Sequence, residues 1–265
     1  MYLDTDAFVL RAVKTLKGRV MVLLFTEKYG KISAGAFQRG NKKNVESALR
    51  PFAFGFFELR KHLGTLNISK TEIKDSYFSI GENVERFTNA SFILEFNDKI
   101  LPEEAPSQEL FVLLADFMRL ISKRKRGFDT LVPAYMLKSM KIWGVAPELD
   151  TCSSCGGVDV NPSTFSVRHG GILCNNCTTP NENNDKLLQD ELIYMVNFDI
   201  VKIMKYLLEN PLTHFENLIL NESTAKKLRR ILKEYAIYHL DISRLKTECF
   251  EGPAVIDPLL YTLKD

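Results

Sequence analysis

Apolar and polar residues alternate along residues 1–80 in short runs separated by turn residues. The runs cover residues 7–13, 20–26, 31–37, 48–60 and 64–78. Alternation with a period of two is typical of β-strands. The run 20–26 is apolar on both sides, which indicates a strand buried on both faces or part of a closed barrel. Five such strands predict a small barrel of the OB (oligonucleotide/oligosaccharide-binding) kind, although an SH3-like barrel would give a similar pattern.

From residue 82 onward the apolar residues recur at intervals of three and four, which is typical of helices. Helices are predicted over residues 84–96, 131–143, 185–209 and 223–242, and over a segment that Pro106-Ser107 opens. Ser223 is expected to cap the last of them. The chain is therefore predicted to be an α+β protein, with an N-terminal five-stranded OB-fold barrel followed by an all-helical domain.

A group of cysteines interrupts the helical part of the chain. Two C-x₂-C pairs stand eighteen residues apart: Cys152, Cys155, Cys174 and Cys177. Two intervening residues allow a tight turn to bring both sulfurs of a pair to one side, and Gly156 and Gly157 supply turn residues that tolerate positive φ. Four thiolates from two such turns suit a tetrahedral Zn²⁺ ion with bonds of about 2.3 Å, and the spacing lies in the zinc-ribbon range.

Other roles for the cysteines fit the sequence less well. Disulfides are disfavoured because the chain shows no secretory segment. A redox C-x₂-C normally occurs once, near a βαβ pattern, and iron–sulfur clusters use other spacings. Four sulfurs leave no open position for an activated water, so a structural zinc ion is expected. His169 is an alternative ligand, but a surface position is expected for it because the cysteine set is complete.

Composition and the distribution of charge narrow the class of protein. The 265 residues are 45% apolar and 26% charged, which is ordinary for a globular protein. No signal peptide and no membrane-spanning run is apparent, so a cytoplasmic protein is expected. Residues 1–80 hold 14 Lys/Arg against 7 Asp/Glu, a balance of +7, whereas the remaining 21 against 26 give −5. This asymmetry favours a polyanion-binding N-terminal unit.

Several cations fall at or near the predicted turns of the barrel, where they can form a surface that follows a phosphate backbone. The residues assigned to this surface are Arg11, Lys14, Arg19, Lys31, Arg39, Lys42 and Lys43. The alternative is that surface lysines and arginines are only solvated. A second basic run, residues 123–126, fits the negative end of a helix dipole, and a partner-binding patch is its second interpretation.

Catalytic motifs are absent from the sequence. There is no nucleotide-binding G-x-x-x-x-G-K-[ST] loop, no H-E-x-x-H and no G-x-S-x-G. The four histidines are scattered, and none has a neighbouring acid in a recognisable catalytic spacing. We therefore expect a binding protein with no enzymatic activity and no small-molecule substrate. A metal-dependent nuclease is disfavoured because no cluster of acids accompanies the cysteines.

Seven short strings resemble the RecO family of bacterial DNA repair proteins. They are DAFVLR (6–11), YGKIS (29–33), ALRPF (48–52), GTL (64–66), GVAPELD (144–150), CSSCG (152–156) and GGILCNNC (170–177). They occur in family order and span most of the chain up to residue 177. Val145 departs from the family, which has an aromatic residue in this string. The C-terminal helices match the family in character only.

The resemblance implies an organisation and a function. It implies an OB domain over residues 1–80, a helical domain in two parts over 81–150 and 179–250, a zinc module over 151–178 between them, and a tail over 251–265. It also implies binding of single- and double-stranded DNA, annealing of complementary strands, and loading of RecA together with RecR and, in some pathways, RecF. Such proteins also bind the C-terminal tail of the single-stranded DNA-binding protein, for which residues 123–126 are the candidate site. The alternative is a zinc-stabilised scaffold whose basic barrel binds protein or RNA without annealing.

Overall fold

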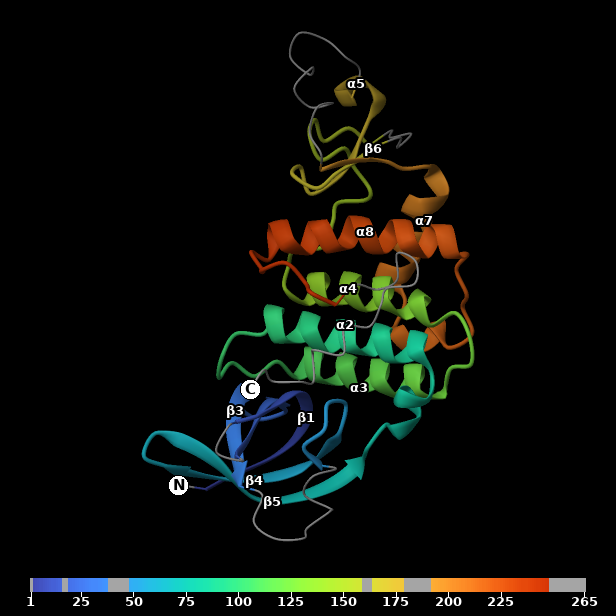
Figure 1. Cartoon of the computed structure of the whole chain (residues 1–265). Helices are drawn as coiled ribbons and strands as arrows, with labels where there is room; N and C mark the ends of the chain where they lie inside the picture. Colours follow the sequence, from blue (N-terminus) through green and yellow to red (C-terminus); the bar gives the residue numbers. More distant parts are fainter. Residues whose placement is uncertain (1, 16–18, 38–47, 159–163, 179–191, 248–265) are drawn as a thin grey trace.

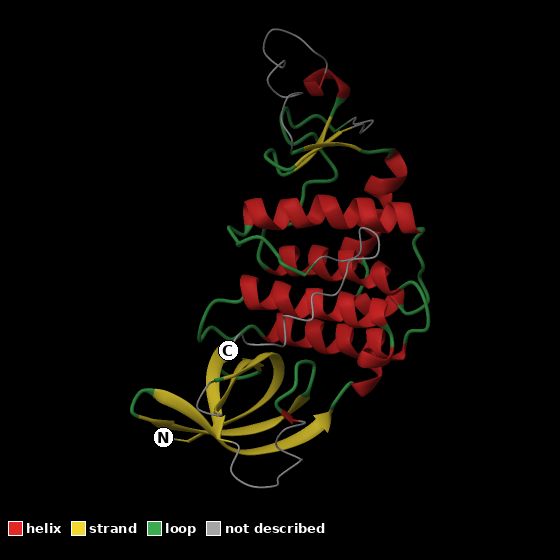
Figure 2. Cartoon of the chain, viewed as in Figure 1, coloured by secondary structure: helices red, strands yellow, loops and turns green. Residues whose placement is uncertain are grey.

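The chain forms an elongated stack in which a layer of helices separates two β-structures. The computed structural model describes residues 2–15, 19–37, 48–158, 164–178 and 192–247. The β-barrel lies at one end, the helices α2, α3, α4 and α8 are layered in the middle, and the cysteine-bearing segment lies at the other end (Figure 1). Strands occupy both ends and helices the centre (Figure 2). The α+β arrangement predicted from the apolar pattern is confirmed.

The N-terminal strands close into the predicted barrel. They are β1 (Tyr2–Lys14), β2 (Arg19–Thr26), β3 (Gly30–Phe37), β4 (Phe54–His62) and β5 (Thr65–Asp75). The order around the barrel is β1-β2-β3-β5-β4, and β4 pairs with β1 to close it. All pairs are antiparallel except β3 and β5, which pair in parallel at Ala34 and Leu66. Closure removes the exposed sheet edges on which strands of other chains could pair.

Strand β2 is apolar on both sides because each side packs against a different core. Val22 and Leu24 belong to the cluster inside the barrel. Leu23 and Phe25 belong to the larger cluster of the helical domain, where the Phe25 ring lies 5.4 Å from that of Phe111. The barrel and the helices are therefore joined by a continuous apolar contact.

The helical domain is built from α2 (Val84–Ile100), α3 (Gln108–Lys123), α4 (Leu131–Ile142), α7 (Phe198–Glu209) and α8 (Glu222–His239), with short 3₁₀ turns η1 (Phe78–Glu82), η2 (Phe128–Thr130) and η3 (Leu212–Phe215). The Tyr135 hydroxyl, fully buried at the centre, donates to Asn97 Oδ1 at 2.8 Å. Among the described helices, none is both long enough and apolar enough to span a membrane.

Side-chain caps fix where the helices begin. Asn83, Ser107, Asn197 and Asn221 each accept a hydrogen bond from a backbone N–H in the first turn of α2, α3, α7 and α8. Such caps satisfy an N–H group that has no partner within the helix. The prediction that Ser223 caps the last helix was wrong by two positions, because Asn221 takes that place.

The predicted fourth strand was also too long at its start. Residues 49–53 lie in turns outside any strand, and β4 begins at Phe54. Phe52 has a φ of +76°, which does not occur in a regular strand. Its side chain packs against Phe87 of α2, with ring centroids 5.4 Å apart. Of the alternating phenylalanines at 52, 54 and 56, the first therefore lies in the turn and the other two lie in the strand.

The prediction of one helix over residues 185–209 was wrong. Residues 193–195 form strand β8 (Ile193–Met195), and α7 begins only at Phe198. Strand β8 completes a three-stranded sheet with β6 (Thr164–Ser166) and β7 (Gly171–Leu173) in the order β7-β6-β8. The apolar residues of this segment lie in a strand that pairs with β6 in the sheet beside the cysteines. Local periodicity does not reveal this pairing.

Candidate metal centre and nucleic-acid interface

The first cysteine pair lies in a tight turn held by backbone hydrogen bonds. The Gly156 N–H donates to the Cys152 carbonyl at 2.8 Å, and the Cys152 N–H donates to the Gly157 carbonyl at 2.9 Å. Gly156 has a φ of +72°, the left-handed conformation that glycine adopts without steric cost. The Ser153 N–H donates to Ile172 of β7 at 2.9 Å and ties this turn to the small sheet.

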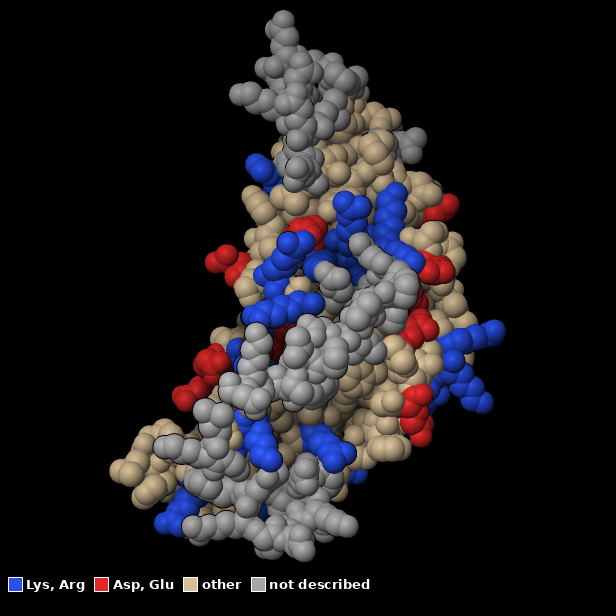
Figure 3. Space-filling model, in the orientation of Figure 1, with Lys and Arg blue, Asp and Glu red and all other residues tan. Residues whose placement is uncertain are grey.

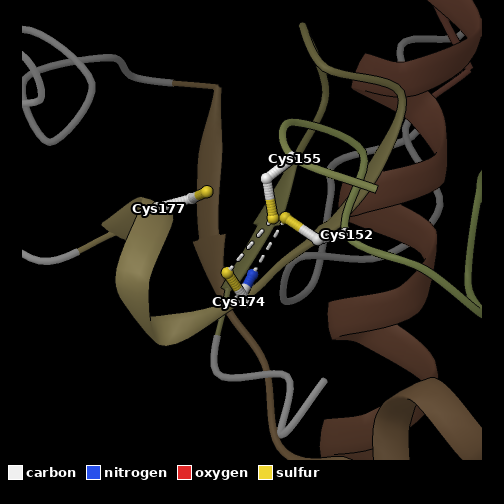
Figure 4. A group of neighbouring side chains, drawn as sticks. All are labelled: Cys152, Cys155, Cys174 and Cys177. Atoms are coloured by element: carbon white, nitrogen blue, oxygen red, sulfur yellow. Dashed lines mark hydrogen bonds between the residues drawn. The ribbon is translucent and has the colours of Figure 1, made fainter. Parts of the chain in front are cut away.

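The second pair is presented by the end of β7 and by the short helix α5 (Asn175–Thr178). The Cys177 N–H donates to the Cys174 carbonyl at 3.1 Å, which closes this turn. All four sulfurs lie within 4.8 Å of one another, and Figure 4 shows them converging from the two turns. The sulfurs of Cys155 and Cys174 are 3.8 Å apart. Tetrahedral bonds of about 2.3 Å would place sulfurs about 3.8 Å apart, so the cysteine set fits a metal ion.

The sulfurs differ in how readily they lose their protons. Burial raises the pKa of the Cys152 thiol, but hydrogen bonds from the backbone N–H groups of Cys155, Cys174 and Ser154 lower it more strongly, to about 6. Burial and the neighbouring sulfurs raise the pKa of Cys177 to about 12. A cation among the sulfurs favours the thiolate form of each, because its charge offsets theirs.

The cysteine module is attached to the helical domain through α8. His239 Nε2 lies 2.6 Å from the Val167 carbonyl oxygen, and the Tyr235 hydroxyl donates to the Gly170 carbonyl at 3.4 Å. At the other side Lys205 of α7 pairs with Asp150 at 2.6 Å. His169, the alternative ligand, is exposed and its Nδ1 lies 3.0 Å from Ser166 Oγ. Within the part of the chain that the structure describes, the group of residues that could hold a metal consists of the four cysteines and does not include His169.

Two of the cations assigned to a phosphate-binding surface lie exposed on β1. Arg11 follows a bulge in the pairing of β1 with β2, and 64% of its side chain is exposed. Its guanidinium lies 3.8 Å from a carboxylate oxygen of Asp98. Lys14 is the last residue of β1 and is also exposed. Both side chains can therefore reach a ligand in solvent.

Lys31 and Arg19 are engaged within the chain. Only 10% of the Lys31 side chain is exposed, and its Nζ lies 3.8 Å from Asp98 and 3.3 Å from Glu103. It also donates to the Asp98 carbonyl at 2.7 Å, which ties β3 to the end of α2. Arg19 donates to Asn67 Oδ1 of β5 at 2.8 Å. The remaining assigned cations, Arg39, Lys42 and Lys43, lie outside the described residues.

The basic run at residues 123–126 divides into one internal and three exposed side chains. Arg124 is buried, and its guanidinium donates to the carbonyls of Arg126 at 2.9 Å, Phe215 at 2.8 Å and Glu216 at 3.0 Å, and also to Leu218. Burial lowers its pKa from the ordinary arginine value. The exposed members are Lys123, Lys125 and Arg126. Arg124 therefore joins the end of α3 to the segment after α7.

Cations also gather over α8, away from the barrel. Figure 3 shows lysine and arginine side chains grouped on this face of the helical domain. The exposed ones on α8 are Lys226, Lys227 and Arg230. Arg229, next to them in sequence, is buried and donates to Asn89 Oδ1 at 2.8 Å. The sequence signal for this group is a set of cations in the first half of a helix, where the dipole disfavours them.

Comparison with known proteins agrees with this architecture over nearly the whole chain. A family model described as "Recombination protein O N terminal" matches residues 1–77, and one described as "Recombination protein O C terminal" matches residues 81–248. The DNA repair protein RecO of Alkaliphilus metalliredigens is 31% identical over 242 residues, covering 91% of this chain and 95% of that protein. Those of Pelotomaculum thermopropionicum and Desulforamulus reducens are 31% and 28% identical, covering 89% and 92% of this chain and 88% and 92% of theirs. The chain therefore belongs to the RecO family of DNA repair proteins.

Proposed function

We propose that this protein mediates homologous recombination by binding single- and double-stranded DNA and annealing complementary strands. The observation that carries the proposal is the pair of exposed cations, Arg11 and Lys14, on a closed barrel in a chain of the RecO family. Two single strands repel each other through their phosphates. A cationic surface lowers that repulsion, and base pairing then drives annealing without a catalytic group.

The phosphate-binding surface comprises the seven cations assigned from the sequence, with the exposed ones making the first contacts. Arg39, Lys42 and Lys43 contribute to it from residues 38–44. The base of this surface is formed by Arg19, which is bound to Asn67, and by Lys31, which is bound to Asp98. Each domain has its own role in this proposal. Residues 1–80 bind DNA, residues 81–150 and 179–250 support the barrel and bind partners, and residues 251–265 form a tail.

The metal in the cysteine module is zinc, one ion per chain. Cys152, Cys155, Cys174 and Cys177 hold it, and with four sulfur ligands it supplies structural cross-linking. The ion holds the two turns and the small sheet together, and the contacts of His239 and Tyr235 transmit that rigidity to α8.

The partners follow from the same role. RecR, and in some pathways RecF, would bind this protein when it loads RecA onto DNA covered by the single-stranded DNA-binding protein. The acidic, apolar tail of that protein would be bound by Lys123, Lys125 and Arg126 together with neighbouring helices, because opposite charges favour this encounter. No covalent chemistry is needed for these steps, so the protein acts without enzymatic turnover.

An annealing assay tests the proposal. Two complementary oligonucleotides, one with a fluorophore and one with a quencher, are mixed with and without the purified protein at several salt concentrations. Acceleration of quenching at low salt that disappears at high salt is expected, because phosphate contacts weaken as counterions accumulate. Binding of both strands without acceleration would support the scaffold alternative instead. A loss of labelled DNA in the presence of magnesium would indicate a nuclease.

A further inference from the structure

The hairpin between β4 and β5 extends from the barrel beside the N-terminus (Figure 1). Leu63 and Gly64 form its turn, flanked by the pair His62 and Thr65. Leu63 is 90% exposed, the highest value among the exposed large apolar residues described in this chain. A leucine at this position contributes no core packing, so the fold alone does not account for it.

The backbone at the turn adds to this observation. Leu63 has a φ of +46° and Gly64 a φ of +79°, which is the pattern of a type I′ turn. Asparagine or glycine is preferred at the first of these positions, because a side chain such as leucine is strained there. The chain therefore keeps an apolar side chain at a strained and exposed position, and such departures from local preference are typical of functional sites.

The charges around the tip are of one sign. Between residues 59 and 71 there is no aspartate or glutamate, whereas Arg60, Lys61 and Lys70 are present and exposed. The acid that precedes this stretch, Glu58, accepts a hydrogen bond from Ser69 at 2.8 Å. An aromatic ring lies alongside, since Tyr2 is 63% exposed and the Arg60 guanidinium lies 5.8 Å from its ring centroid. An apolar tip with one ring and several cations matches the chemistry of a single-stranded nucleic acid.

The hairpin is also continuous with the surface proposed to bind phosphates. Asn67 of β5, close to the tip, accepts the hydrogen bond from Arg19 at the start of β2. Gly35 of β3 pairs with Asn67 in the same place. A strand bound along the start of β2 can therefore continue onto the hairpin without leaving the protein surface.

We propose that the β4–β5 hairpin binds an unpaired nucleobase, with Leu63 and Tyr2 against base faces and Arg60 and Lys61 on the adjoining phosphates. A base inside a duplex is stacked on both faces and cannot make these contacts, so the hairpin favours single strands over duplex. This inference rests on the proposed DNA binding and adds the element that distinguishes the two forms of DNA.

Leu63→Asn tests the inference without harming the fold, because Asn-Gly is the preferred sequence for this turn. The full-length protein is titrated into a fluorescent oligothymidine and into a duplex of equal length, with fluorescence anisotropy as the readout. L63N should weaken single-strand binding by roughly 5-fold or more, the loss of one base contact, and leave duplex binding unchanged. Leu63→Met, which keeps an apolar tip, should bind like the wild type.

The salt dependence separates the apolar contact from the ionic ones. Lys61→Gln should reduce the slope of log affinity against log salt by about 0.7 for a single strand, whereas L63N should leave that slope unchanged. Equal single-strand affinity of L63N and the wild type would overturn the inference and leave a protein partner as the occupant of the tip. Failure of the wild type to bind either DNA at low salt would instead contradict the proposed function itself.

Discussion

The role of Arg124 can be tested because the structure gives it internal contacts that its neighbours lack. Its guanidinium donates to the carbonyls of Arg126, Phe215, Glu216 and Leu218. In Arg124→Met the side chain still fills space, but four carbonyls lose their donor. At about 1 kcal/mol for each hydrogen bond lost, the free energy of unfolding should fall by about 4 kcal/mol.

Urea denaturation followed by far-ultraviolet circular dichroism measures the effect. The matched controls are Lys125→Met and Arg126→Met, whose side chains are exposed and whose loss should change the free energy of unfolding by less than about 0.5 kcal/mol. Arg124→Lys should lie between, because an ammonium group cannot reproduce the planar fork of donors. A loss of less than about 1 kcal/mol in Arg124→Met would refute the structural role. If that variant also lost affinity for the tail of the single-stranded DNA-binding protein, residue 124 would belong to a partner surface instead.

Three further variations test other parts of the structure. Removal of metal with a strong chelator should release one zinc ion per chain and lower the melting temperature, whereas a fully folded metal-free protein would contradict a structural site. Lys31→Met should lower the free energy of unfolding by about 2 kcal/mol, less than for a fully buried pair because Glu103 is exposed, whereas loss of the exposed pair between Lys28 and Asp4 should cause no measurable change and supplies the control. Tyr135→Phe should cost about 1–2 kcal/mol in thermal unfolding, since Asn97 loses its buried donor, and an unchanged melting temperature would argue against that bond.

The features that could be predicted from the sequence are those that depend on residues close to one another along the chain. The cysteine spacing alone specifies two turns whose sulfurs converge, because each C-x₂-C pair needs only its own backbone. The change of apolar period after residue 82 likewise separates the barrel from the helices. In these regions local preference and tertiary structure agree, so the pattern is sufficient.

The features that could not be predicted depend on distant partners. In the sequence, Lys31 is a cation next to a predicted turn. Its side chain is paired and buried because Asp98 and Glu103 lie beside it, and the sequence of the strand holds no information about these two residues. In the sequence Arg124 is one of four neighbouring cations, but three of its four carbonyl partners, on Phe215, Glu216 and Leu218, lie 91–94 residues away along the chain. Strand β8 has too few residues to show a period, and its pairing with β6 alone identifies it as a strand.

The central claim is that exposed cations of the barrel bind DNA through its phosphates. The most direct measurement is the affinity for a single-stranded oligonucleotide as a function of salt, for the wild type and for the variant Arg11→Glu with Lys14→Glu. We expect the variant to bind more weakly, with a slope of log affinity against log salt that is smaller by about 1.4, the contribution of two phosphate contacts. Identical affinity and slope in the two proteins would contradict it.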